Sequence, residues 1–445
     1  MDRRPSRAHI ALVALVAIAV RVAALQAGAH LNLAGDERYY WETGPDKEGA
    51  IYKAPVVQAP LWGMVLWYLR GAGFHHPIAG RALSTIIGAC TPLLVYLLAT
   101  KVFDRRTGLV AGLLYGLFPE QIGFSHYLWA EILLSFLAVL SVYFLFAFLE
   151  DPGDPRRLYG SALAAGFALI TKEYILLLFI GYLGAIPFLR GRFHAGRVLI
   201  ACILALLPAA TYSVPMSLAF RRVIVISDGV MHSISYSEGI DAIDKFSAKN
   251  VQSQWHEIWR TVRKRGGEEE ARYFAEQLCN LWTPNSYLIV RLIHTPGDLA
   301  FRYGRITPLS VVLAWVTALV YVAIVIAGLA GLCLGDTGPF MNLSFIALGG
   351  ISLSGIVLWE MSRYRLAFMF ILIIWAAYFV AHFRDLAANV RRRGRVVTLC
   401  VLLLLFAHIV SSRIHTLGRF SVPHQVRINV SSRARSSPLP SAPLS

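Results

Sequence analysis

The sequence predicts an all-α polytopic membrane protein, and three observations support that fold class. Hydrophobic residues make up 56% of the 445 residues, and the mean hydropathy is +0.57. Charged residues make up only 15%, whereas soluble proteins usually carry about 25%. Continuous apolar runs of about 17–25 residues, the length that crosses a bilayer core as a helix, recur along the chain. Their continuity excludes a closed β-barrel, whose strands alternate apolar and polar residues.

We expect about 11 transmembrane helices from these runs. The expected spans are 8–30, 80–100, 107–123, 126–149, 158–171, 174–188, 198–217, 306–334, 340–359, 364–383 and 396–412. The first span follows three arginines and resembles a cleavable signal peptide. We interpret it as an uncleaved span, because many further spans follow and the orientation of the chain depends on it.

Basic residues in the connections predict the orientation. With the N-terminus in the cytoplasm, the basic clusters at 101–106, 156–157, 190–197 and 384–395 all fall on the cytoplasmic side, as the positive-inside rule requires. The net charge of +16 is therefore assigned to membrane topology, and we expect no nucleic-acid partner. The partners that we expect include membrane lipids.

The same count divides the chain into four regions. An N-terminal transmembrane module (1–217) contains a first outer loop at about 31–79. An extracytoplasmic loop region (218–305) and the C-terminal transmembrane helices (306–412) follow. The last region, 413–445, is a polar tail rich in serine and proline, which we expect to be disordered.

Two short helices are expected in the outer loops. The stretch 60–73, "PLWGMVLWYLRGAG", is too short to span and is rich in aromatic residues, which suits a helix at the membrane interface. The stretch 268–282 places Ala271, Phe274, Ala275 and Leu278 on one helical face. We expect that face to pack on the membrane domain.

A carboxylate pair, Asp36 and Glu37, comes just after the first span, beside Arg38, Tyr39 and Tyr40. One interpretation is a solvated loop whose charges hold the span in place. The other is catalytic: transfer of a sugar from a lipid phosphate needs one base to take the acceptor's proton. Phosphate leaves well once cations neutralise it, whereas a glycosidase also needs a protonated acid partner.

Candidate cations lie near the outer ends of expected spans: Lys53, Arg81, Lys172 and Arg363. Lys172 is a candidate for binding the lipid phosphate, with snorkelling to the headgroups as the alternative. Arg363 suits phosphate through its planar fork.

His126 and Glu131 lie at the outer start of the expected span 126–149, roughly one and a half helical turns apart. An ionisable group at membrane depth indicates function, although Glu131 can instead serve as a hydrogen-bonding group within the bundle.

Several stretches in order along the chain resemble one family. They are "GDERYYWE" (35–42), "APLWGMVLWYL" (59–69), the segment 81–140, "GFALITKEYILL" (166–177), "LCNLWTPNSYLIVRLI" (278–293) and "WEMSRYRLAFMF" (359–370). Together they resemble the polyprenyl-phosphate-sugar-dependent glycosyltransferases of the GT-C superfamily, in particular the bacterial protein-O-mannosyltransferase and lipid A aminoarabinose-transferase branch. The resemblance implies a GT-C-type helical bundle, an active site on the outer face and inverting transfer.

Residues carry over from the family one at a time. The catalytic candidates are Asp36, which matches the family's catalytic acid, and Glu37, which follows it as in the family. The substrate-binding candidates that we take from the motifs and their surroundings are Lys53, Tyr39, His126, Glu131, Lys172, Arg363 and Tyr364. Two departures stand out. Relatives often have a basic residue and two prolines before the interfacial helix, where this chain has Gln58-Ala59-Pro60, and often a proline soon after the pair that matches Arg363-Tyr364.

The function that the resemblance implies is inverting transfer of a hexosyl or pentosyl group from a polyprenyl-phosphate donor to a lipid, glycan or protein hydroxyl. It acts at the outer face of a bacterial inner membrane. Asp36 and Glu37 could ligate Mg or Mn, but neither a DxD pattern nor a histidine cluster accompanies them, so we expect no metal and no cofactor.

Two alternatives remain. A transporter or lipid flippase would place charges at mid-membrane on broken helices, and a membrane assembly protein could carry a degenerate site.

Overall fold

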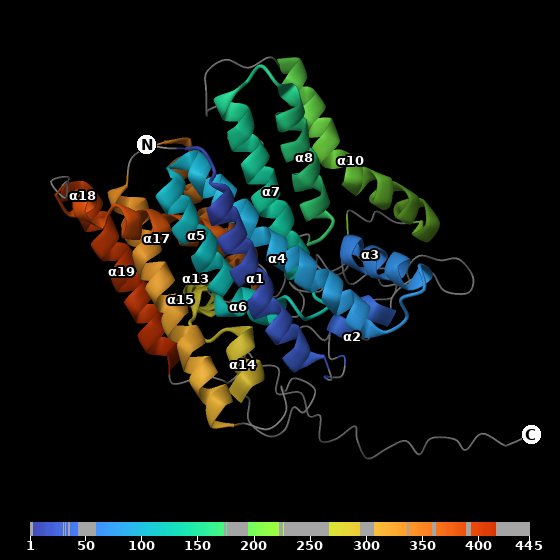
Figure 1. The fold of residues 1–445 in the computed structure, drawn as a ribbon, viewed down its shortest axis with the longest axis horizontal. Helices are drawn as coiled ribbons and strands as arrows, with labels where there is room; N and C mark the ends of the chain where they lie inside the picture. Colours follow the sequence, from blue (N-terminus) through green and yellow to red (C-terminus); the bar gives the residue numbers. More distant parts are fainter. Residues whose placement is uncertain are drawn as a thin grey trace, which may run out of the picture.

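The computed structural model describes residues 3–29, 31, 33, 36–42, 59–172, 175, 195–221, 226, 267–293, 307–335, 338–357, 362–388 and 393–414. In these residues every regular element is a helix (Figure 1). The all-α fold class is confirmed. The candidate Lys53, the expected span 174–188 except Ile175, and the tail after residue 414 lie outside the described residues.

Long helices form the bundle. They are α1 (Arg7–Gly28), α4 (Pro77–Val102), α7 (Glu131–Glu150), α10 (Ala195–Phe220), α15 (Pro308–Leu334), α16 (Pro339–Val357) and α19 (Arg393–Arg413). The shorter elements are α2 (Asp36–Glu42), α3 (Pro60–Gly71), α5 (Arg105–Leu117), α6 (Pro119–Phe124), α8 (Pro155–Leu169), α13 (Gly267–Trp282), α14 (Tyr287–Ile293), the 3-10 helix η3 (Ser362–Phe368), α17 (Met369–Ala381) and α18 (Phe383–Ala388).

Seven helical segments of the described chain are long and apolar enough to cross a membrane. Six coincide with the helices α1, α4, α7, α10, α15 and α19, and the seventh joins η3 to α17. The polytopic character of the chain is confirmed. The expected total of about 11 spans is not, because α5 and α8 are shorter than a bilayer core requires.

Three expected spans have different boundaries. The span 107–123 is two helices, α5 and α6, because Pro119 ends the first and begins the second. The span 126–149 begins only at Glu131, and residues 125–130 form a turn. His126 is therefore not on α7, and the helical spacing expected between His126 and Glu131 is wrong. The span 364–383 begins earlier and as the 3-10 helix η3.

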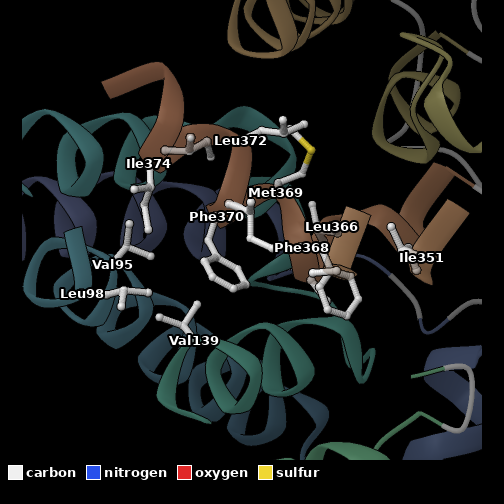
Figure 2. Packing of buried hydrophobic residues seen from close by; sticks show 14 of the residues in the cluster. Val95, Leu98, Val139, Ile351, Leu366, Phe368, Met369, Phe370, Leu372 and Ile374 are labelled. Atoms are coloured by element: carbon white, nitrogen blue, oxygen red, sulfur yellow. The ribbon is translucent and has the colours of Figure 1, made fainter. Parts of the chain in front are cut away.

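The helices pack as neighbours around a continuous apolar core. Helix α4 contacts α1, α5 and α7, helix α8 lies between α7 and α10, and α17 contacts α15 and α5. In Figure 2, Phe370 of α17 points toward Val139 of α7 and Leu98 of α4. Residues 369–378 are all buried, so α17 is central to the bundle, and the η3 segment before it is held in place.

The two helices expected in the outer loops are present. Helix α3 begins at Pro60, a favoured first position. Helix α13 matches 268–282, but its expected packing face is wrong. Phe274 is 37% exposed, whereas Gln277 and Leu281 are buried. The C-terminal end of α13 is the anchored part, because the Trp282 indole donates to Ser352 Oγ at 3.0 Å.

Close packing of α15 on α17 depends on two glycines. A Cβ on Gly331 would lie 2.1 Å from the Trp375 carbonyl oxygen, and one on Gly328 would lie 2.7 Å from the Leu372 carbonyl oxygen. Small residues at helix interfaces let backbones approach in this way in membrane proteins. The α15–α17 pairing therefore tolerates no side chain at these positions without a shift of the helices.

We predict that Gly331→Ala destabilises the protein by about 1–3 kcal/mol, the usual cost of overpacking. The matched control is Gly349→Ala on α16, where a Cβ meets nothing within 4 Å. Alanine in a helix is intrinsically favoured over glycine. The check is the thermal midpoint of each purified variant in detergent. An equal midpoint for the two variants contradicts the close approach of α15 and α17.

Candidate functional site

The candidate site lies at the end of the bundle opposite the N-terminus. Figure 1 shows α2 and α14 at that end, away from the start of α1. Six parts of the described chain contribute charged side chains: α2, the N-terminal ends of α4 and α7, residue 172 after α8, α14 and η3.

Asp36 is paired with Arg363. Its Oδ2 atom lies 2.8 Å from Arg363 Nη1, and the two residues are 327 positions apart in sequence. The Asp36 side chain is 27% exposed, whereas that of Arg363 is 8% exposed. Asp36 is thus the carboxylate that solvent or a substrate can reach, and the arginine lies behind it.

Arg363 is shared with a second carboxylate. Its Nε atom lies 3.5 Å from Glu131 Oε1, and Lys172 Nζ lies 3.9 Å from the same oxygen. Glu131 is buried, with 1% of its side chain exposed. A chain of ionic contacts therefore runs from Asp36 through Arg363 and Glu131 to Lys172.

Glu37 points into the protein. Its Oε1 atom lies 3.4 Å from Arg81 Nη2 and accepts from the Leu128 backbone N–H at 3.2 Å. Its Oε2 atom lies 3.8 Å from Arg291 Nη1, and the side chain is fully buried. Arg81 also donates to the Gly28 carbonyl at 2.9 Å, which suits a cation at the C-terminal end of α1. Glu37 thus joins α1, α2, α4, α14 and the 125–130 turn.

Arg291 is the site residue that the sequence analysis missed. Its guanidinium lies over the rings of Tyr127 at 4.3 Å, Trp129 at 4.7 Å and Tyr287 at 5.6 Å. Arg363 lies over the Trp129 ring at 4.9 Å. The signal in the sequence was a single arginine within the apolar stretch "YLIVRLI", where a charge indicates function.

The cluster carries an excess of positive charge. Four cations pair with three carboxylates: Arg81, Lys172, Arg291 and Arg363 with Asp36, Glu37 and Glu131. Among the residues that the structure describes, the formal balance of four against three is +1. Burial alone would raise the pKa of Asp36, but Arg363, Lys172 and Arg291 outweigh it and hold that pKa below its usual value.

Lys172 stays charged for a related reason. Burial alone would lower the pKa of the Lys172 ammonium. Tyr40 and Glu131 raise that pKa by more than burial lowers it, so the pKa lies above its usual value. The ammonium lies 5.8 Å from the Tyr40 ring centroid. A buried, charged lysine beside a partly exposed Asp36 suits an anionic ligand.

His126 lies close to the cluster without joining the chain of ionic contacts. It is buried against α1, where a Cβ on Gly28 would lie 2.5 Å from its ring. Burial, reinforced by the charges of Arg81 and Arg291, lowers the pKa of His126 to about 3. The ring is therefore neutral at physiological pH.

Two tyrosines of the predicted site lie at its edge. The Arg363 guanidinium lies 5.4 Å from the Tyr364 ring, and Tyr39 packs edge-on against Tyr40 with ring centroids 5.9 Å apart. Both Tyr39 and Tyr364 are half-buried. The structure thus brings together residues that are far apart in sequence: Asp36 of α2, Glu131 of α7, Lys172 after α8 and Arg363 of η3.

Across the described ranges, the side chains form no group of three or more His, Cys, Asp or Glu able to hold a metal ion.

An apolar pocket lies between α7, α8, α16 and the η3–α17 segment. Its lining includes Ala168, Ile175, Leu343, Phe368 and Phe370. Ala168 and Ile175 flank Lys172 in the chain, and Phe368 ends the same η3 helix that carries Arg363. The α7 residues that line the pocket, Ala138, Ser141 and Val142, lie roughly two or more helical turns beyond Glu131, so the pocket lies deeper in the bundle than the charged cluster.

An all-helical membrane bundle with a carboxylate and buried cations at one end is what the resemblance to GT-C glycosyltransferases predicts. Residues 57–214 match the family model of the dolichyl-phosphate-mannose-protein mannosyltransferases. This match confirms the resemblance at the level of the superfamily. No curated protein matches the chain.

Solved structures give distant matches. AglB from Archaeoglobus fulgidus, an oligosaccharyltransferase in complex with an inhibitory peptide and a dolichol-phosphate, aligns with 93% of this chain at 14% identity and a TM-score of 0.46. Its apo form gives the same values, and this chain spans 56% of the archaeal chain. ArnT from Cupriavidus metallidurans bound to undecaprenyl phosphate aligns over 85% of this chain and 79% of its own, at 14% identity and a TM-score of 0.39.

We predict that Glu37→Gln destabilises the fold by roughly 3–5 kcal/mol, because it removes the carboxylate that pairs with the buried Arg81 and Arg291. Asp36→Asn changes a carboxylate that is partly exposed, and we expect a loss of about 1 kcal/mol or less. Thermal unfolding of the two purified variants checks the difference. If Glu37→Gln is as stable as Asp36→Asn, Glu37 does not join the surrounding elements.

Proposed function

We propose that this chain is an inverting glycosyltransferase that moves a sugar from a polyprenyl-phosphate donor to an acceptor hydroxyl of a lipid, glycan or protein. One observation carries the proposal: α7, η3 and the chain around residue 172 contribute both to the ionic chain Asp36–Arg363–Glu131–Lys172 and to the lining of an apolar pocket. A ligand with a phosphate and a long apolar chain fits that combination of surfaces.

Asp36 is the proposed base. In a single displacement, the acceptor oxygen forms a bond to the anomeric carbon as the bond from that carbon to the phosphate oxygen breaks. The acceptor's proton goes to Asp36, and polyprenyl phosphate leaves with the bonding electrons. Attack opposite the leaving group inverts the anomeric centre. Lys172 and Arg363 stabilise the negative charge that grows on the phosphate.

The shared arginine couples donor binding to the basicity of Asp36. Without donor, Arg363 pairs with Asp36 at 2.8 Å and keeps its pKa low, which makes a weak base. A donor phosphate competes for Arg363 and adds negative charge nearby, and both effects raise the pKa of Asp36. The carboxylate becomes a stronger base once the donor is in place.

The other residues support this arrangement. Glu37, a catalytic candidate from the sequence, is instead proposed to position Arg81 and Arg291, since its side chain is fully buried. Tyr39, Tyr364 and His126 are proposed to line the substrate site. Lys53 is retained as a proposed substrate-binding residue from the family resemblance. The reaction that we propose requires no metal, because cationic side chains supply the positive charge at the phosphate.

The experiment that tests the proposal is mass spectrometry of lipid extracts from a strain without the gene. We expect a polyprenyl-phosphate sugar to accumulate, and the wild-type gene to clear it. Complementation with Asp36→Asn should leave it accumulated, because loss of a positioned base costs about two to four decades in rate. Clearance by Asp36→Asn at the wild-type rate removes Asp36 from the chemistry. An unchanged lipid profile in the deletion strain contradicts the proposed donor.

The pH dependence of donor consumption tests the coupling through Arg363. The base form of Asp36 is the active form, so activity falls as pH drops through its pKa. Arg363→Gln removes the nearest positive charge, raises that pKa, and should shift the acid limb of kcat/KM to higher pH, besides lowering the rate.

The matched control is Arg38→Gln, since Arg38 is exposed on the same short helix and pairs with Glu42. This change should leave the acid limb in place. An acid limb that does not move in Arg363→Gln shows that Arg363 does not set the pKa of Asp36 in the enzyme.

The proposed location is a bacterial inner membrane with the site on the outer face. His75 and Gly153 are exposed and lie at opposite ends of the bundle, after α3 and after α7. In a variant without the five natural cysteines, His75→Cys should react with a membrane-impermeant maleimide in intact spheroplasts. Gly153→Cys should react only after lysis. The reverse pattern would place the Asp36 site in the cytoplasm.

A further inference from the structure

A second pocket lies at the other end of the bundle, near the N-terminus. It is formed where α4 and α7 end, where α16 begins and by the second half of α17. Three charged side chains line it: Arg3, Lys101 and Glu150. None of these residues belongs to the candidate active site, which is built at the opposite ends of α4 and α7.

The mouth of this inner-end pocket carries a surplus positive charge. Lys101 Nζ forms an ion pair with Glu150, and the two side chains are 21% and 42% exposed. Arg3 is exposed. Among the described lining residues, two cations and one carboxylate give a formal charge of +1 at the mouth, which one phosphodiester group would neutralise.

The floor of the pocket is aromatic and apolar. The Phe103 ring stacks on Tyr378 at 4.3 Å and lies 5.1 Å from the Trp375 ring. Phe340 lies 5.7 Å from Trp375, whose indole donates to Ser344 Oγ at 2.8 Å. Phe146, Leu149 and Met341 also line the pocket. The floor is therefore packed and fixed, and it offers an apolar surface directly below a charged mouth.

We propose that the inner-end pocket binds an anionic phospholipid. Its phosphate lies between Arg3 and Lys101, and the glycerol and first acyl carbons lie on the aromatic floor. Basic pockets between membrane helices on the cytoplasmic side bind anionic headgroups in this way. A headgroup with a quaternary ammonium would add positive charge to a mouth that already has a surplus.

The bound lipid joins helices that lead to the candidate site. Helix α7 begins with Glu131 of the candidate site and ends with Glu150 at the pocket. Helix α17 also lines the pocket, and it directly follows η3, which carries Arg363. A lipid in the pocket therefore stabilises the pairing of α7, α16 and α17. This role is independent of the reaction proposed for Asp36.

Native mass spectrometry of the full-length protein in detergent tests this site. After delipidation, phosphatidylglycerol or phosphatidylcholine is added at equal concentration. We expect the wild type to retain one phosphatidylglycerol and to retain phosphatidylcholine roughly tenfold less. The Arg3→Gln/Lys101→Gln double variant should lower phosphatidylglycerol retention roughly tenfold or more.

The matched control is Arg105→Gln/Arg106→Gln, which removes the same charge from exposed positions at the start of α5. This variant should bind like the wild type. A steric variant, Gly338→Leu, keeps every charge but places a side chain at the pocket lining, where a Cβ meets nothing within 4 Å. It should also lose the lipid. Equal retention by all variants, or displacement of the lipid by free inorganic phosphate, overturns the proposal.

Discussion

The end of the bundle that holds the candidate site depends on the pairing of Arg363 with both Asp36 and Glu131. Removing ions from water is costly, so buried charges persist only where partners compensate them. Four buried cations lie here, and the carboxylates of Asp36, Glu37 and Glu131 form ion pairs with them. The cations are Arg81, Lys172, Arg291 and Arg363. Each segment is thereby placed relative to the others. Within the described part of the chain the cluster has one more cation than carboxylates, which suits one further negative group, and the partly exposed Asp36 marks where that group can approach.

The helices explain how the cluster is held. Helix α5 ends at Leu117, and α6 begins at Pro119. The chain then continues to Glu131 through a stretch that contains several buried polar residues. Arg365, two residues after Arg363, is fully buried and pairs with Glu120 of α6 at 2.9 Å. It also donates to the Leu281 carbonyl at 2.6 Å. Those bonds fix η3 between α6 and α13, so Arg363 cannot move far from Asp36 without breaking them.

Much of this could be predicted from the sequence, since the length of an apolar run determines whether a helix can span a membrane. Asp36, Lys172 and Arg363 were found because their motifs place charges where apolar runs end. Arg291 was missed because its environment, the rings of Tyr127, Trp129 and Tyr287, comes partly from a distant turn. The position of His126 was wrong because an apolar run does not reveal a turn inside it. The packing face of α13 was wrong because tertiary contacts at its C-terminal end outweigh its apolar stripe.

We propose that Arg363 forms an ion pair with Asp36 when no donor is bound, and with the donor phosphate during the reaction. A structure of the protein with bound polyprenyl phosphate measures that directly. We predict phosphate oxygens within hydrogen-bonding distance of Lys172 and Arg363, and the lipid chain in the apolar pocket lined by Ala168 and Phe368. The Asp36–Arg363 distance should then be longer than 2.8 Å. A phosphate bound elsewhere, with the Asp36–Arg363 pair unchanged, would contradict it.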